Sequence, residues 1–101
     1  MDRFLLVYRG APDGAAGSRQ HDLGRWANWF DSLGDRLLDP GGLSHASVDI
    51  DTRLAGPKSS SSSLTGYSVV AATDFNEAVA LAQQCPIFHE HGSLEIAHLA
   101  S

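Results

Sequence analysis

Imidazole titrates near neutral pH, so the five histidines of this sequence are its first candidates for acid–base chemistry. His21 lies where a helical pattern begins, and it could act as a general base if a carboxylate oriented it. The same helix does not supply that carboxylate, because Asp35 would lie about 21 Å away along a straight helix and Asp22 points to a different side. The partner must therefore come from elsewhere in the fold or from a second subunit. The alternative is that His21 is a solvated residue of the first turn.

A second candidate base is His45, which falls in a predicted strand. We expect it to face a cleft together with Tyr8 and Tyr67 from the neighbouring strands. A proton shuttle beside aromatic walls would suit a small aromatic or quinone-like ligand. The alternative is that His45 is a polar residue on an edge strand.

The aromatic residues of the first helical segment divide into two groups. Trp26 and Phe30 recur at helical spacing, so we assign them to the core. Trp29 lies off that apolar stripe, and we predict that it lines a ligand pocket or an interface.

Three histidines near the C-terminal end raise the question of a metal. In an extended segment His89 and His91 would share one side, and His98 follows in the same region. Zinc, copper and iron sites use such groups. The pair precedes a glycine in a connector, however, and we predict no metal site and no cofactor.

Composition excludes several classes of protein. The formal charge is −5, and no Lys or Arg follows Lys58, so an acidic chain without a basic patch argues against a nucleic-acid partner. No apolar run is long enough for a signal peptide or a membrane span, and we expect a cytoplasmic protein. Cys85 is the only cysteine, and we expect a small buried side chain rather than a reactive thiol.

The periodicity of apolar residues predicts the elements that hold these side chains. Alternation predicts strands over residues 3–9, 43–51, about 66–72 and 93–99. Helical spacing predicts one helix from about residue 18 or 20 to 38 and a second that follows the cap Asp74 and stops at Pro86. In the first helix the predicted apolar stripe consists of Leu23, Trp26, Ala27, Phe30, Leu33 and Leu37; in the second it consists of Ala78, Val79 and Ala82. Glu77 is predicted to reach back to the backbone amide of Asp74. Residues 52–64, with five serines in a row, are predicted to form a mobile hairpin loop.

This order, β-α-β-β-α-β in one domain of residues 1–101, predicts a ferredoxin-like α+β fold with a four-stranded antiparallel sheet and both helices on one face. Two helices cover one side of such a sheet. The first strand is nevertheless apolar on both sides, as is the strand that contains Tyr67 and Val69. An uncovered apolar face predicts association, and we expect a homodimer that packs sheet against sheet.

Four segments in this order resemble the YCII-related proteins, also called the DGPF-domain family. They are FLLVYRG, WANWFDSLGDRLLDPG, GYSVVAATDFNEAVALAQQCP and GSLEIAHL, and together they extend from Phe4 to Leu99. The resemblance implies a ferredoxin-like fold that assembles as a dimeric α/β barrel, with a cleft between sheet and helices. It also implies that related members carry a histidine at the position of His21. The Asp-Gly-Pro-Phe segment itself is absent, since Gly56-Pro57-Lys58 and the serines stand in its place.

Two functions follow from the sequence. The first is a cofactor-independent small-molecule enzyme in which His21 or His45 is the general acid or base, with Tyr8, Trp29 and Tyr67 as ligand contacts. The second is a non-catalytic ligand-binding or protein-interaction module built on the same fold. Whether the protein is an enzyme is left open by the sequence.

Overall fold

The computed structural model describes residues 1–10, 21–44, 46–53, 55–60 and 63–100. Its elements, in chain order, are β1 (Asp2–Arg9), α1 (Leu23–Leu33), η2 (Gly34–Arg36), β2 (Leu37–Leu43), β3 (Val48–Asp49), β4 (Lys58–Ser59), β5 (Leu64–Ala72), α2 (Phe75–Ala82), η3 (Pro86–Glu90) and β6 (Ser93–His98). The symbol η marks a short 3₁₀ helix.

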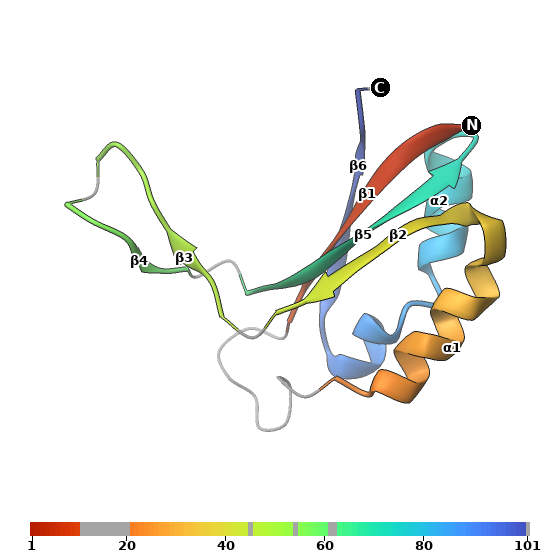
Figure 1. The fold of residues 1–101 in the computed structure, drawn as a ribbon, viewed down its shortest axis with the longest axis horizontal. Helices are drawn as coiled ribbons and strands as arrows, with labels where there is room; N and C mark the ends of the chain where they lie inside the picture. The colour runs from red at the N-terminus through yellow and green to blue at the C-terminus, as the bar shows by residue number, and fades with distance from the viewer. Residues whose placement is uncertain (11–20, 45, 54, 61–62, 101) are drawn as a thin grey trace.

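The main sheet has four strands in the order β2-β5-β1-β6, and each neighbouring pair is antiparallel. Both α-helices lie on the same side of this sheet (Figure 1). The predicted α+β architecture, with a four-stranded antiparallel sheet and two helices, is therefore confirmed. Strands β3 and β4 form a separate two-stranded hairpin that projects away from the sheet (Figure 1).

The core lies between the sheet and the helices. Alternate residues of the central strand β1, namely Phe4, Leu6 and Tyr8, are almost completely buried there. The intervening Leu5 and Val7 are half-buried on the other side, opposite Val69 and Tyr67 of β5. Directly paired residues share one face of an antiparallel sheet, so these four residues form an apolar surface on the side that bears no helix. We call it the open face.

The first helix is shorter than its apolar pattern predicts. It ends at Leu33 because Gly34 adopts a left-handed φ of 56° and its backbone amide donates to the carbonyl of Asp31. Within the helix Trp29 is buried and belongs to the core, whereas Leu23 is exposed. The predicted position of Trp29 beyond the core is therefore wrong, since the buried stripe is rotated around the helix.

The second strand of the sheet also lies elsewhere than predicted. We expected residues 39–42 to end a helix and residues 43–51 to form the strand, but β2 spans Leu37–Leu43. Pro40 is tolerated because β2 is an edge strand whose register with β5 shifts twice. Gly41 has φ of 68°, and a Cβ atom there would lie 1.9 Å from the carbonyl oxygen of Tyr67. Only glycine fits this close approach.

Of the predicted strand over residues 43–51, Leu43 belongs to the end of β2 in the main sheet, and Val48–Asp49 pairs separately with Lys58–Ser59. Part of the predicted 52–64 loop is therefore a strand. His45 and the serines at 61 and 62 lie outside the described residues, so the predictions for them stay predictions.

The segment from β5 to α2 follows its prediction closely. Asp74 caps α2, since its carboxylate accepts the backbone amide of Glu77 at 2.9 Å. The Glu77 side chain differs from the prediction, because it accepts the amide of Thr73 and pairs with Arg36. Val79 also differs, since it is half-exposed and not part of the buried stripe.

Candidate functional site

The described residues contain one histidine that is both buried and paired with a carboxylate. The Nδ1 atom of His21 lies 2.8 Å from the Oε1 atom of Glu90, and their side chains are only 5% and 9% exposed. The two residues are far apart in the sequence, since His21 precedes α1 and Glu90 ends η3. The fold therefore supplies the orienting carboxylate that helix α1 does not.

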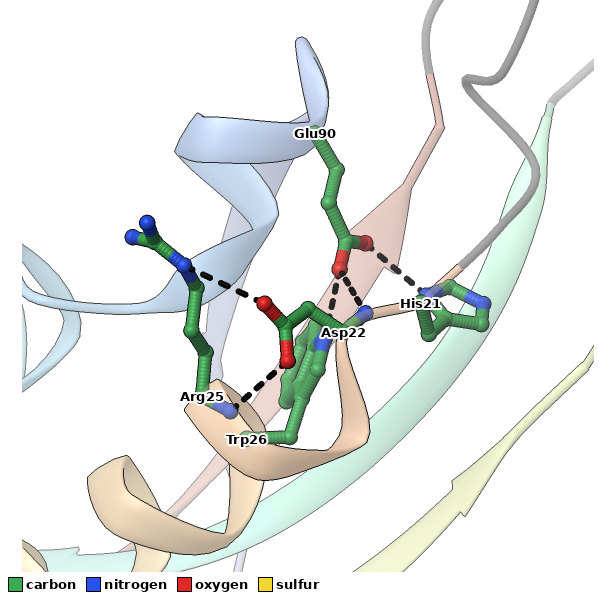
Figure 2. Close-up of polar contacts among 5 residues, drawn as sticks. All are labelled: His21, Asp22, Arg25, Trp26 and Glu90. Carbon is green, nitrogen blue, oxygen red and sulfur yellow. Dashed lines mark hydrogen bonds and ion pairs between the residues drawn. The ribbon is translucent and has the colours of Figure 1, made fainter.

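Glu90 is itself held in place by α1. Its second oxygen, Oε2, accepts the indole N–H of Trp26 at 2.9 Å and the backbone N–H of Asp22 at 3.1 Å. Figure 2 shows His21, Asp22 and Trp26 converging on this one carboxylate. Two N–H donors thus fix one oxygen, and the other oxygen lies in hydrogen-bond contact with the imidazole ring.

The local sequence explains why these groups meet. Asp22 caps α1 by accepting the backbone amide of Arg25 at 3.2 Å, and its carboxylate also pairs with the Arg25 guanidinium at 3.3 Å (Figure 2). Trp26 is one turn further along the helix, so its indole faces back towards the cap. The first turn of α1 therefore presents three groups to Glu90 at once.

The other side of the site is the short 3₁₀ helix η3. Pro86 opens η3, Ile87 anchors it in the core, and His91 closes it with a left-handed φ of 62°. The next residue, Gly92, has no room for a side chain, because a Cβ atom would lie 2.3 Å from the carbonyl oxygen of Arg9. This close packing against the end of β1 sets the position of Glu90.

Buried aromatic and polar side chains, those of Tyr8, Trp26 and Ser68, lie next to the dyad of His21 and Glu90; we call them the buried layer. The rings of Tyr8 and Trp26 meet edge to face at 4.8 Å. The Tyr8 hydroxyl donates to Ser68 at 2.7 Å, and the Ser68 hydroxyl donates to the carbonyl of Pro40 at 2.6 Å. Burial raises the pKa of Tyr8 well above its usual range, although the hydrogen bond to Ser68 acts in the opposite direction. Tyr8 therefore stays a neutral hydrogen-bond donor inside the core.

The single cysteine lies in the same layer. Burial raises the pKa of the Cys85 thiol to about 12, and the charge of Glu90 acts in the same direction. A thiol that stays protonated is a poor nucleophile. The prediction of a small buried side chain is thus confirmed.

The predicted ligand contacts do not come together. Tyr8 is fully buried and Trp29 is in the core, where its indole N–H donates to the carbonyl of Leu81 at 3.2 Å. Tyr67 is 44% exposed, and its pairing with Val7 places it on the open face, on the other side of the sheet from Tyr8. The expectation that the two tyrosines share a cleft is wrong, because one residue of offset along a strand reverses the side.

The other histidines that the structure describes are not part of the dyad. His89 and His91 are exposed at the end of η3, and His98 pairs with Asp2 at 3.1 Å. Within the described ranges, no group of three or more His, Cys, Asp or Glu side chains is arranged to hold a metal ion. Among the helices of those ranges, none is both long and apolar enough to cross a membrane.

The partner of His21, which the sequence did not reveal, is Glu90. It lies between His89 and His91, and no spacing rule connects it with His21 across the chain. Its one sequence signal is that it lies two residues after a short apolar segment, Pro86-Ile87-Phe88, that could be expected to pack against the core.

Comparison of this chain with protein-family models, with curated proteins and with solved structures found no match.

Proposed function

We propose that this protein transfers protons on a small organic substrate without a cofactor, with His21 as the general base and Glu90 as the residue that orients it. The observation that carries the proposal is the 2.8 Å contact between His21 Nδ1 and a Glu90 carboxylate whose other oxygen is already held by two donors. A carboxylate has no proton to give, so it selects the tautomer in which Nδ1 carries the hydrogen and Nε2 is basic.

The reaction that fits this pair is an isomerisation by proton removal and return. Nε2 takes a proton from an acidic C–H or O–H bond, and the imidazolium so formed is stabilised by the Glu90 carboxylate. The same nitrogen then returns the proton to another atom of the substrate, so the protein ends unchanged. Because the His21 side chain is only 5% exposed, neighbouring residues must move aside for a substrate to reach Nε2.

The assembly belongs to the same proposal. We propose a ferredoxin-like fold that pairs through its open face into a homodimer of the dimeric α/β-barrel kind, in keeping with the YCII-related resemblance. The strand order β2-β5-β1-β6 supports it, as do the half-buried Leu5, Val7 and Val69 on the side without helices. Light scattering across a dilution series tests the dimer, and a mass that stays monomeric at every concentration would contradict it.

Hydrogen–deuterium exchange tests the chemistry without a known substrate. A panel of small aromatic ketones with acidic C–H bonds is incubated with the protein in D₂O, and loss of the C–H signal is followed by proton NMR. We expect exchange with the wild-type protein, none above buffer with His21→Gln, and unchanged exchange with His89→Gln. His89 is the matched control, because it is exposed and adjoins Glu90 in the chain. Equal exchange with wild type and His21→Gln would refute the assignment.

A non-catalytic module is the second candidate, and one observation favours it. Glu90 joins the first turn of α1 to η3 through three hydrogen bonds, which is also what a purely structural connection would do. If ligands from a thermal-shift screen bind wild type and His21→Gln equally, and none of them exchanges in D₂O, the protein is a binding module and not an enzyme.

A further inference from the structure

Strand β6 is an edge of the main sheet, so the backbone groups on its outer side can pair with another strand. In the described part of the chain it has one neighbour, β1. The amide of Leu99 donates to the carbonyl of Arg3 at 2.9 Å, so odd-numbered residues of this segment turn their backbone groups towards β1. By the same alternation, Leu94, Ile96 and His98 direct their N–H and C=O groups away from β1, towards the outer edge.

The two edges of the sheet differ in how well they resist such pairing. Edge β2 carries Pro40, the left-handed Gly41 and two shifts of register, which are features that block the addition of a strand. Edge β6 has none of them: all six residues from Ser93 to His98 pair in regular register with β1, and none is proline, glycine or lysine.

Apolar side chains adjoin the same edge. Phe75 and Val79, one turn apart on α2, are 49% and 42% exposed. The ring of Phe75 packs against that of His98 on β6, with the centroids 5.9 Å apart. The side of α2 that carries Phe75 and Val79 therefore borders the outer edge of β6. A strand added to β6 would place apolar side chains close to these two residues.

We propose that β6 pairs antiparallel with β6 of a second copy of this chain, centred on Ile96, to give a continuous sheet across two molecules. In this register Ile96 faces its own counterpart, and Leu94 faces His98 of the second copy. All the outward backbone groups then belong to hydrogen-bonded pairs, and each such pair exchanges both of its N–H···O bonds.

Side-chain charge disfavours the neighbouring register centred on Glu95. With the centre on Ile96, Glu95 faces Ala97 of the second copy. With the centre on Glu95, two like charges would lie directly opposite, which destabilises a strand pair. A two-fold contact uses the same patch on both copies, and this edge meets that condition, because Ile96 faces Ile96 and no like charges lie opposite each other; this favours a second copy over an unrelated strand.

The contact is distinct from the open face and goes beyond the proposed function. A two-fold axis perpendicular to the sheet leaves the helices of both copies on one side, so the two α2 helices approach each other through Phe75 and Val79. The open face stays free for its own pairing. If both contacts form, each chain touches two others, and the smallest closed assembly contains four chains.

Proline at position 98 tests the pairing. His98→Pro removes an outward-facing N–H without removing a bond to β1, and His98→Ala removes the same imidazole but keeps the amide, so alanine is the matched control. By sedimentation velocity over a dilution series, we expect the dissociation constant of one association step to rise roughly 5- to 100-fold for proline relative to alanine, because two symmetry-related hydrogen bonds are lost. Equal association of the two folded variants, or a wild-type protein that stays monomeric, would overturn the proposal.

Disulfide trapping tests the register even if His98→Pro fails to fold. Residues 95 and 97 of different copies would be a non-hydrogen-bonded pair with Cα atoms about 4.5 Å apart, within reach of a disulfide. The native Cys85 is buried and does not compete. After mild oxidation of a mixture of Glu95→Cys and Ala97→Cys chains, we expect cross-linked dimers that contain one of each. Cross-linking that is no better in the mixture than in either variant alone would contradict the register.

Discussion

Replacing Glu90 with glutamine, and separately with leucine, isolates the two roles of this side chain. Glutamine can place its carbonyl oxygen where Oε2 accepts from Trp26 and Asp22, and its NH₂ group where Oε1 meets His21. An NH₂ group donates, so Nδ1 must then accept, and the hydrogen of the ring moves to Nε2. Leucine keeps the approximate size but offers no acceptor to any of the three donors.

The two substitutions should therefore differ sharply in stability. Leucine leaves the largely buried Trp26 indole and His21 ring without their acceptor, whereas the exposed amide of Asp22 can turn to water. Hydrogen bonds to a charged group contribute about 1.5–3 kcal/mol each, so for the two buried groups we expect leucine to cost at least about 3 kcal/mol. For a domain of this size that lowers the Tm by roughly 12–24 °C. Glutamine, which keeps all three contacts, should cost about 1 kcal/mol or less.

Chemical denaturation and imidazole NMR measure both effects. Urea unfolding gives the free energy of unfolding, and the ¹⁵N shifts of His21 report which ring nitrogen carries the hydrogen. We expect Glu90→Gln to be nearly as stable as wild type, with the hydrogen moved from Nδ1 to Nε2 and the exchange activity lost. The orienting role is refuted if Nδ1 keeps its hydrogen in the folded Glu90→Gln protein. His89→Gln controls for the loss of a polar side chain beside the site, and it should change neither measurement.

Two further predictions concern the packing around the site. Because burial raises the pKa of Cys85 from 9.0 to about 12, ionisation of this thiol favours the unfolded chain. The free energy of unfolding should therefore fall as the pH rises from 9 to 12, by up to about 1.4 kcal/mol per pH unit from this group. In urea titrations the free energy of unfolding of Cys85→Ala should depend less steeply on pH, and an unchanged dependence would contradict the shift. Gly41→Ala should destabilise the fold by about 2 kcal/mol or more, because its φ of 68° is left-handed and a Cβ atom would lie 1.9 Å from the Tyr67 carbonyl. The neighbouring Gly42→Ala, with nothing within 4 Å and no positive φ, should cost far less by the same thermal-melt assay, and similar losses for both would disprove the steric argument.

The sequence predicts the fold where local signals and burial agree. Strand β1 alternates cleanly, and the cap at Asp74 marks the start of α2, so the strand and the start of the helix agree with the prediction within a residue or two; the helix ends at Ala82, earlier than the predicted stop at Pro86. The predicted helix and strand boundaries are wrong between residues 34 and 51, because two tertiary effects override the local sequence pattern there. Gly34 ends the first helix early, and a bulged edge strand makes use of Pro40 and Gly41, which by composition resemble a turn.

The site was predicted only in part. His21 was identified from its residue type and its place before a helix, and the need for a carboxylate from elsewhere followed from helix geometry. Glu90 was not identified, because the contact joins two segments whose meeting depends on how η3 packs against α1 and β1. The sequence also does not predict that Tyr8 and Tyr67 face opposite sides of the sheet, because this depends on the register between the paired strands.

The position of β1 has a consequence for how the chain folds. This first strand occupies the interior of the sheet, where Asp2 pairs with Ala72 and Phe4 with His98. Neither neighbour of β1 exists until most of the polypeptide has been synthesised, so an apolar strand leaves the ribosome long before its partners. Loop closure over such separations is slow compared with local helix formation. A nascent chain of this protein therefore exposes FLLVY for much of its synthesis, and this segment is where a chaperone would be needed most.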